Sequence, residues 1–203
     1  MSGIHPEMRF APSLDADVAA MNSEFLALLT SPAQVSGQDL LGLDASIIDA
    51  LRKLSDAQLE HFAGAPVLLA EFLPAAAIPD VAGEIGYRVA ESDLMTAWER
   101  QRYGFANQLF ATLWQMSRQQ HALTHLCLGI DKALAEQFAR QNFSAVHAAA
   151  RTAHLRLHAR LATHPDSWTD LLRAVISGDT NQIRIAQLSM IPVTMANAFV
   201  DVA

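Results

Sequence analysis

The sequence predicts an all-α fold built from two copies of one helical unit in a pseudo-two-fold arrangement. Helix-favouring Ala, Leu, Gln, Glu and Arg are abundant, alternating β-branched stretches are scarce, and Asn-Gly and Asp-Gly turns are absent. A short motif also occurs twice, as Leu41-Gly42-Leu43-Asp44 and as Leu128-Gly129-Ile130-Asp131. Aligned without gaps, residues 41–72 correspond to 128–159. Each motif precedes a helical stretch, a polar break and a second helical stretch.

Length and composition favour a compact protein of the cytoplasm. The chain has 203 residues, 51% of them hydrophobic, which suits one domain or two small ones. Residues 1–20 are expected to form a flexible tail, because their start is polar and lacks the pattern of a secretory signal. The longest apolar run, 65–78, contains Glu71 and two prolines and cannot span a bilayer. The single cysteine, Cys127, favours a reducing compartment.

The first unit is expected over residues 21–73 and starts with helices on either side of its motif. Apolar spacing predicts a helix over 21–29, which ends before Pro32. Asp44 is a good N-cap for a second helix that continues to about residue 54.

A third helix of this unit is predicted from a capping pattern. Ser55 and Gln58 have the spacing of a capping box, and Gly64 is expected to end the helix that they begin. The two short helices are nearly contiguous, so they must meet at a sharp corner. Such a corner is typical of helix-turn-helix proteins.

Residues 74–92 contain prolines and glycines and are expected to link the two units. One long amphipathic helix is predicted over residues 93–126. Its apolar positions recur mainly at intervals of three, four and seven residues, namely Trp98, Phe105, Leu109, Leu113, Met116, Leu123 and Leu126. This stripe is expected to enter the core or to pack on a partner helix, so a homo-oligomer through 93–126 is one prediction.

The second unit, residues 93–203, repeats the corner. Asp131 is expected to cap a helix that ends near Arg140. Either Asn142 or Ser144 then caps the next helix, which is expected to continue to about residue 161.

Prolines mark the boundaries of the last predicted helices. The segment His164-Pro165-Asp166 is expected to end the preceding helix. Two further helices are predicted over 170–175 and 181–191, and the last is expected to end before Pro192.

Several of these features occur together in one known family. In the first unit they are Leu41-Gly42-Leu43, the helix-break-helix stretch 51–63 and the apolar extended piece 67–72. The second unit matches through 110–130, Phe138, Asn142-Phe143-Ser144 and Val146. On these residues the chain resembles FlhD, the small all-helical subunit of the bacterial flagellar master transcription activator.

The resemblance implies a transcriptional regulator made of two tandem FlhD-like units. Single-copy family members dimerise, so the family homodimer would become an intramolecular pseudo-dimer here. The family acts on DNA, as an activator in flagellum biogenesis, together with a zinc-binding partner subunit, FlhC. The zinc would then belong to the FlhC-like partner, and no cofactor is expected in this chain.

The charge distribution indicates which half of the chain would meet DNA. Residues 1–100 carry fifteen Asp and Glu against five Lys and Arg, whereas residues 101–203 carry six against nine. A solvated basic face explains the second half equally well, because acidic residues share it. If DNA is bound, the expected phosphate contacts are Lys132, Arg140, Arg151, Arg156 and Arg160.

Histidines in the second half suggest a metal site as a minor alternative. His147, His154 and His158 follow one another at intervals of seven and four, which would place them on one side of a continuous helix. His121 and His125 have a similar spacing. No Glu or Cys accompanies either group closely, so scattered polar histidines are the favoured interpretation.

The sequence contains no recognisable catalytic pattern, and we do not expect an enzyme. Cys127 has no evident base nearby, and glycine-rich phosphate loops are absent. Two rivals to the DNA-binding regulator remain open. One is a diverged interaction module without DNA binding, which the acidic first half favours. The other is a helical metal-binding sensor, which the histidines favour.

Overall fold

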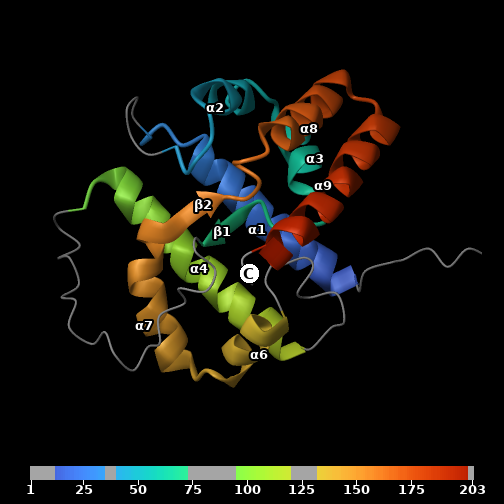
Figure 1. Cartoon of the computed structure of the whole chain (residues 1–203). Coiled ribbons are helices and arrows are strands. Elements are labelled where there is room, and N and C mark those ends of the chain that lie inside the picture. Colours follow the sequence, from blue (N-terminus) through green and yellow to red (C-terminus); the bar gives the residue numbers. More distant parts are fainter. Residues whose placement is uncertain (1–11, 35–39, 73–94, 120–131, 201–203) are drawn as a thin grey trace, which may run out of the picture.

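The computed structural model describes residues 12–34, 40–72, 95–119 and 132–200. These residues are mostly helical, and Figure 1 shows the helices grouped around a short two-stranded sheet. The expected all-α class is therefore confirmed, with β1 (Ala70–Phe72) and β2 (Leu157–Ala159) as an addition. The predicted linker, 74–92, lies outside the described residues.

The first helix, α1 (Pro12–Leu29), is longer than predicted. It begins at a proline, whose fixed φ suits the first turn of a helix. The expectation of a flexible tail over residues 1–20 is therefore wrong for 12–20, and residues 1–11 lie outside the described part. The buried side chains of α1 recur at helical intervals and include Val18, Met21 and Phe25.

The predicted corner of the first unit is present as α2 (Ala45–Leu51) and α3 (Asp56–Ala63). The capping box is confirmed: the Gln58 amide donates to Oγ of Ser55, and the Ser55 amide donates to Oε1 of Gln58 at 2.9 Å. Gly64 is the C-cap residue, as expected. Asp44 occupies the N-cap position of α2, but its side chain makes no capping hydrogen bond.

The repeated motif begins with a tight turn in the first unit. The Leu43 amide donates to the carbonyl oxygen of Leu40, and the two central residues, Leu41 and Gly42, have φ angles of 56° and 85°. Two successive positive φ angles are typical of type I′ turns and favour glycine. Gly129 and Asp131 of the second motif lie outside the described residues.

The long helix of the second unit is α4 (Ala97–Gln119), within the predicted range of 93–126. A capping box not expected from the sequence precedes it, because the Thr96 amide donates to Oε2 of Glu99 at 2.7 Å. Hydrogen bonds from Thr96 to the Glu99 carboxylate lower the pKa of that group. The predicted stripe is buried from Trp98 to Met116, and its last two members lie outside the described part.

The second corner consists of α6 (Lys132–Arg140) and α7 (Phe143–Ala153). Asn142 caps α7, because the Ala145 amide donates to its Oδ1 at 2.8 Å. The prediction that this helix continues to 161 is wrong. After Ala153 the chain makes one 3₁₀ turn, η3 (His154–Arg156), and enters β2, whose hydrogen bonds to β1 replace those of a helix.

The chain ends in a helical hairpin of α8 (Pro165–Ser177) and α9 (Thr180–Val200), which packs on the first unit. Both helices exceed their predicted ranges. Pro165 begins α8, where its missing amide hydrogen costs nothing, and Pro192 lies inside α9, which continues past it. The rings of Phe62 in α3 and Trp168 in α8 lie 5.6 Å apart.

The two units have the same order of elements at a constant shift along the chain. The second unit's α6, α7 and β2 begin 87 residues after α2, α3 and β1 respectively, and α4 covers the range that corresponds to α1. Ala70 pairs with Ala159, Glu71 with His158 and Phe72 with Leu157. The middle pair, Glu71 and His158, is itself related by the shift of 87. The pairing is therefore symmetric about this pair.

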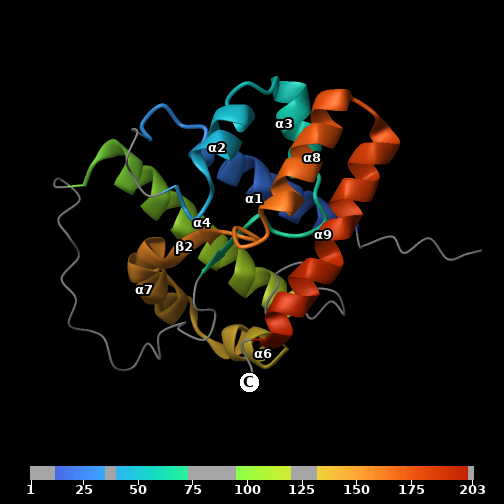
Figure 2. The same ribbon diagram turned by 45° about the horizontal axis from the view of Figure 1, so that its top comes forward.

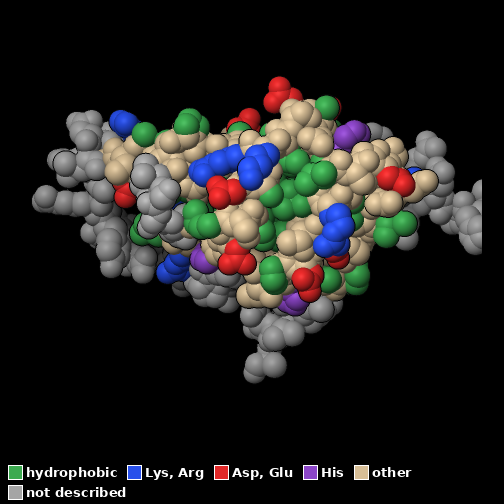
Figure 3. Space-filling view, turned by 90° about the horizontal axis from the view of Figure 1, so that it is seen from above, with side chains coloured by type: hydrophobic (Ala, Val, Ile, Leu, Met, Phe, Trp, Pro, Cys, Tyr) green, Lys and Arg blue, Asp and Glu red, His purple; other side chains and the backbone are tan. Residues whose placement is uncertain are grey.

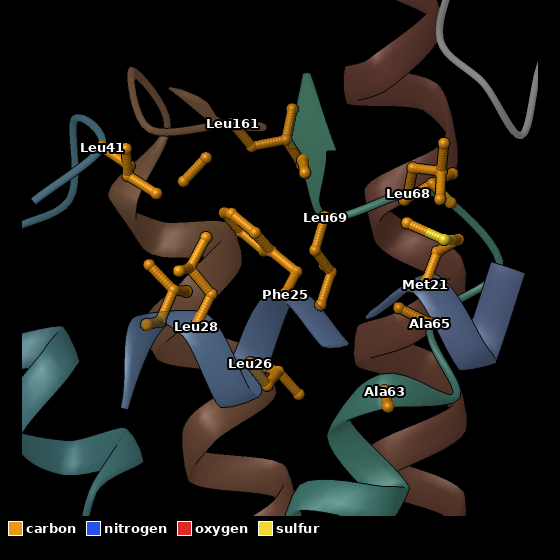
Figure 4. Packing of buried hydrophobic residues seen from close by; sticks show 14 of the residues in the cluster. Met21, Phe25, Leu26, Leu28, Leu41, Ala63, Ala65, Leu68, Leu69 and Leu161 are labelled. Carbon is orange, nitrogen blue, oxygen red and sulfur yellow. The ribbon is translucent and has the colours of Figure 1, made fainter. Parts of the chain in front are cut away.

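Buried side chains of both units form one hydrophobic cluster. The α1 and α4 helices lie side by side near its centre, where the Phe25 and Phe105 rings are 5.3 Å apart (Figures 1 and 2). In Figure 4, Phe25 extends from α1 toward the segments that carry Leu41, Leu69 and Leu161. Among the described helices, none has the length and apolar character required to cross a bilayer.

The glycines supply a test of this backbone. A Cβ at Gly42 would lie 2.8 Å from Nδ1 of His158 and would strain a positive φ, so Gly42→Ala should destabilise the protein by about 2 kcal/mol. Gly178 has a φ of 72° but open surroundings, so Gly178→Ala should cost about 1 kcal/mol. Gly104 lies inside α4 with nothing close, so Gly104→Ala should stabilise by about 0.5–1 kcal/mol.

Urea unfolding midpoints of the three variants measure this order. Equal midpoints for Gly42→Ala and Gly178→Ala would show that the contact of Gly42 with His158 is unimportant.

Candidate nucleic-acid and partner surfaces

Arg160 lies at the junction of the sheet with both units. Its guanidinium donates to the carbonyl oxygen of Ala70 at 3.4 Å and lies 3.9 Å from a carboxylate oxygen of Glu71. Its backbone amide donates to Leu69 at 2.7 Å, and its carbonyl oxygen accepts from Nε1 of Trp168 at 2.8 Å. This residue therefore connects β1, the chain after β2 and α8.

Among the predicted phosphate contacts whose side chains are described, Arg160 alone lies in the interior. Only 4% of its surface is exposed, so its guanidinium is not available to a DNA backbone. The prediction for this residue is wrong because the chain enters a strand before it, instead of continuing as a helix with an outward basic face. Its role is to satisfy backbone and carboxylate oxygens in the core.

Three other predicted contacts are exposed but do not form one cluster. Lys132 and Arg140 lie at opposite ends of α6, and Arg140 is 3.7 Å from Glu136. Arg156 lies in η3, beyond the far end of α7, a helix about 16 Å long at 1.5 Å per residue. The side chain of Arg151 lies outside the described part. The face seen in Figure 3 likewise shows Lys and Arg interspersed with Asp and Glu.

The predicted histidine stripe does not exist as one helical face. His147 is exposed on α7, His154 is buried in η3, and His158 belongs to β2. Among the described residues, no group of three His, Cys, Asp or Glu side chains is placed to hold a metal ion. His121 and His125 lie outside the described part.

Two of these histidines make aromatic contacts instead. The His154 ring meets the Tyr103 ring edge-on, with centroids 5.5 Å apart. The His147 ring stacks on Phe143, with centroids 6.2 Å apart and an angle of 11° between the planes. The first contact joins η3 to α4, and the second lies on the surface of α7.

Phe143 and His147 belong to an aromatic cluster, which we define as Trp114, Arg118, Phe143 and His147. Phe143 is 62% exposed although it is a large apolar side chain, and its ring lies 6.0 Å from that of Trp114. The Arg118 guanidinium lies over the Trp114 ring, 4.9 Å from its centroid. Exposed aromatic rings beside a cation are typical of protein-binding surfaces. This cluster was not predicted from the sequence, because its members come from two helices.

The apolar stripe of α4 is not a free surface. It faces α1, α6 and α7 of the same chain. The solvent side of α4 carries polar and small residues, namely Gln101, Gly104, Gln108, Ala111 and Gln115. A hollow between α1 and α4 is lined by Glu24, Ala27, Leu28, Gln101, Phe105 and Gln108. The predicted homo-oligomer through 93–126 required an exposed apolar face on this helix, and the described part of that face is buried within the chain.

Two buried polar side chains hold the segments that precede the strands. The Nδ2 of Asn22 in α1 lies within 3.0–3.2 Å of the carbonyl oxygens of Ala63, Ala65 and Val67, and its Oδ1 accepts from the Leu69 amide at 2.8 Å.

In the second unit, Arg102 of α4 has the corresponding role. Its Nη2 donates to the carbonyl oxygens of Leu155 and Leu157, at 3.3 and 3.2 Å. Neither role was predicted from the sequence. A usable signal was present, because Asn22 and Arg102 each lie four residues after one large buried apolar residue and three before another.

Comparisons with family models, curated proteins and solved structures find no match to this chain.

Asn22 supplies a test of the buried hydrogen bonds. Asn22→Leu would leave one buried amide and three buried carbonyl groups without this partner, so it should destabilise the protein by about 4 kcal/mol. Asn107→Leu is the control, because that side chain bonds only one turn back, to the carbonyl oxygen of Tyr103, and should cost less than about 1 kcal/mol. Urea denaturation measures both, and equal losses would refute the special role of Asn22.

Proposed function

We propose that this protein is an FlhD-like subunit of a transcription-regulating complex, which binds a partner protein and meets DNA as part of that complex. The observation that carries the proposal is the symmetric pairing of β1 with β2. The two paired strands also occupy equivalent positions in the two units, because β2 begins 87 residues after β1. This is the arrangement expected if a family homodimer has been fused into one chain.

The aromatic cluster is the surface that best suits the partner subunit. Phe143 offers a large apolar ring, and Arg118 offers a cation whose guanidinium lies over the Trp114 ring. A partner with an apolar pocket rimmed by acidic residues would bury the ring and pair with the cation. In this proposal the partner is FlhC-like and carries the zinc and much of the DNA contact.

Of the predicted phosphate contacts whose side chains the structure describes, Lys132, Arg140 and Arg156 remain exposed and available to DNA. Three phosphate contacts predict a slope of about −2.7 in a plot of log affinity against log salt concentration. That is a weak electrostatic contribution for a lone DNA-binding protein. Arg140 is also partly neutralised by Glu136. These charges therefore suit an auxiliary role beside a partner that supplies most of the affinity.

One specific observation favours the rival, an interaction module without DNA binding. The burial of Arg160 removes one of the five predicted phosphate contacts, and the exposed ones are separated by the length of α7. The metal-binding sensor receives no such support, because η3 and β2 interrupt the histidine stripe.

The DNA contribution is tested with a matched pair of triple variants. Lys132, Arg140 and Arg156 changed together to Ala should weaken binding of the complex with a co-expressed FlhC-like subunit to a fluorescent duplex most at low salt. The plot of log affinity against log salt concentration should be flatter by about 2.7, so the loss of affinity should be about 40-fold smaller at about 0.2 M than at about 0.05 M salt. Lys53, Arg100 and Arg173 changed to Ala remove equal, exposed charge elsewhere and should leave the slope unchanged.

Fluorescence anisotropy at several salt concentrations measures the slopes. A separate variant, Phe143→Ser, tests the partner surface and should abolish co-purification of the FlhC-like subunit. If Phe143→Ser releases the partner while both triple variants bind DNA like the unmodified complex, the interaction module without DNA contact is the correct function.

A further inference from the structure

The aromatic cluster of the second unit has a counterpart in the first, because the two units share one order of elements at a shift of 87 residues. The four residues at the corresponding positions of the first unit are small or acidic: Ala27, Ser31, Asp56 and Glu60. None of them is aromatic or cationic. The two units have therefore diverged at this surface, although their elements correspond.

The fold explains the residue at this surface in the first unit better than the one in the second. Asp56 and Phe143 are the first residues of α3 and α7 respectively. An acidic side chain at the start of a helix is stabilising, because its charge complements the positive end of the helix dipole. Phe143 has no such effect, and its ring is 62% exposed, so burial of that ring contributes little to folding.

The two surfaces have opposite charge. Asp56 and Glu60 are exposed one turn apart on α3, and within the described part of the chain neither forms an ion pair. The corresponding turn of α7 carries Phe143 and His147, and the cluster to which they belong contains the cation of Arg118. An acidic partner surface is attracted by the cation and repelled by the two carboxylates.

The first unit also uses one of its four positions inside the chain. Ser31 is 6% exposed, and its hydroxyl donates to Oε1 of Gln101 in α4 at 2.6 Å. Arg118, which corresponds to Ser31, is exposed. At this place the first unit therefore offers a partner neither an aromatic ring nor a cation.

We propose that each chain binds one partner subunit, through the aromatic cluster, and that Asp56 and Glu60, in place of Phe143 and His147, exclude a second partner from the first unit. This inference rests on the proposed function, because it takes the partner to be the same FlhC-like subunit. The symmetric pairing of β1 with β2 presents two equivalent positions to that subunit. Asp56 and Glu60 are specificity-determining residues, since they decide between the two positions.

Native mass spectrometry of the complex with a co-expressed FlhC-like subunit counts the partners. The unmodified chain should carry one. A triple variant with Ala27→Trp, Asp56→Phe and Glu60→His transfers three members of the cluster to exposed positions of the first unit and should carry two. Asp56→Asn with Glu60→Gln is the matched control, which removes the same charge without adding a ring and should still carry one. Circular dichroism verifies that the variants remain folded.

The reciprocal variant, Phe143→Asp with His147→Glu, gives the second unit the acidic residues of the first and should carry no partner. Two partners on the unmodified chain would refute the inference and leave the proposed function intact, as would a triple variant that still carries one. If the reciprocal variant keeps its partner, the partner surface of the proposed function is wrong. If the unmodified chain binds no FlhC-like subunit, the proposed function and this inference both fail.

Discussion

The short antiparallel pairing of β1 with β2 is the constraint on which the rest of this structure depends. It joins segments that lie 87 residues apart, and its symmetry about Glu71 and His158 determines how the two units face each other. Two strands of three residues are not stable in isolation. Arg160 stabilises the junction by bonding to Ala70 and by accepting from Trp168, which also attaches the C-terminal hairpin. Asn22 and Arg102 hold the segments that enter the strands, so each unit uses its long helix to position its own strand.

This arrangement also decides which surfaces are available for function. The apolar sides of α1 and α4 are buried in the protein interior, where they form one core with the helices of both corners. The large apolar groups that remain exposed include Phe143 in the aromatic cluster and Ile185, Leu188 and Met195 on α9. The first has a cation beside it and suits a partner of different chemistry. The α9 residues lie on a helix whose one charged residue in the sequence is Arg184.

Local signals predicted the elements that local interactions stabilise. The capping box of Ser55 and Gln58, the cap at Asn142 and the apolar stripe of α4 each depend on residues within a few positions of one another. The predictions failed where proline was taken as a helix end, because Pro165 begins α8 and Pro192 is accommodated inside α9. They also failed at residues 154–161, although the alignment with the extended piece 67–72 could have indicated a strand there. At 154–161 the abundance of helix-favouring residues predicted a helix, whereas the correspondence with 67–72 indicated an extended segment.

The sequence by itself determined the helical class, the corners and the repeat, because helix propensity and capping act through neighbouring residues. It also indicated that the second unit carries more positive than negative charge, and it predicted five phosphate contacts there: Lys132, Arg140, Arg151, Arg156 and Arg160. Only the tertiary structure decided that Arg160 is buried and that the three histidines are separated. Both outcomes follow from the pairing of β2 with β1, which requires a partner strand from the other unit. Hydrogen bonds to a distant segment stabilise a turn and a strand where the local sequence favours a helix. The free energy of those bonds depends on residues far away in the chain, so no local sequence pattern reveals it.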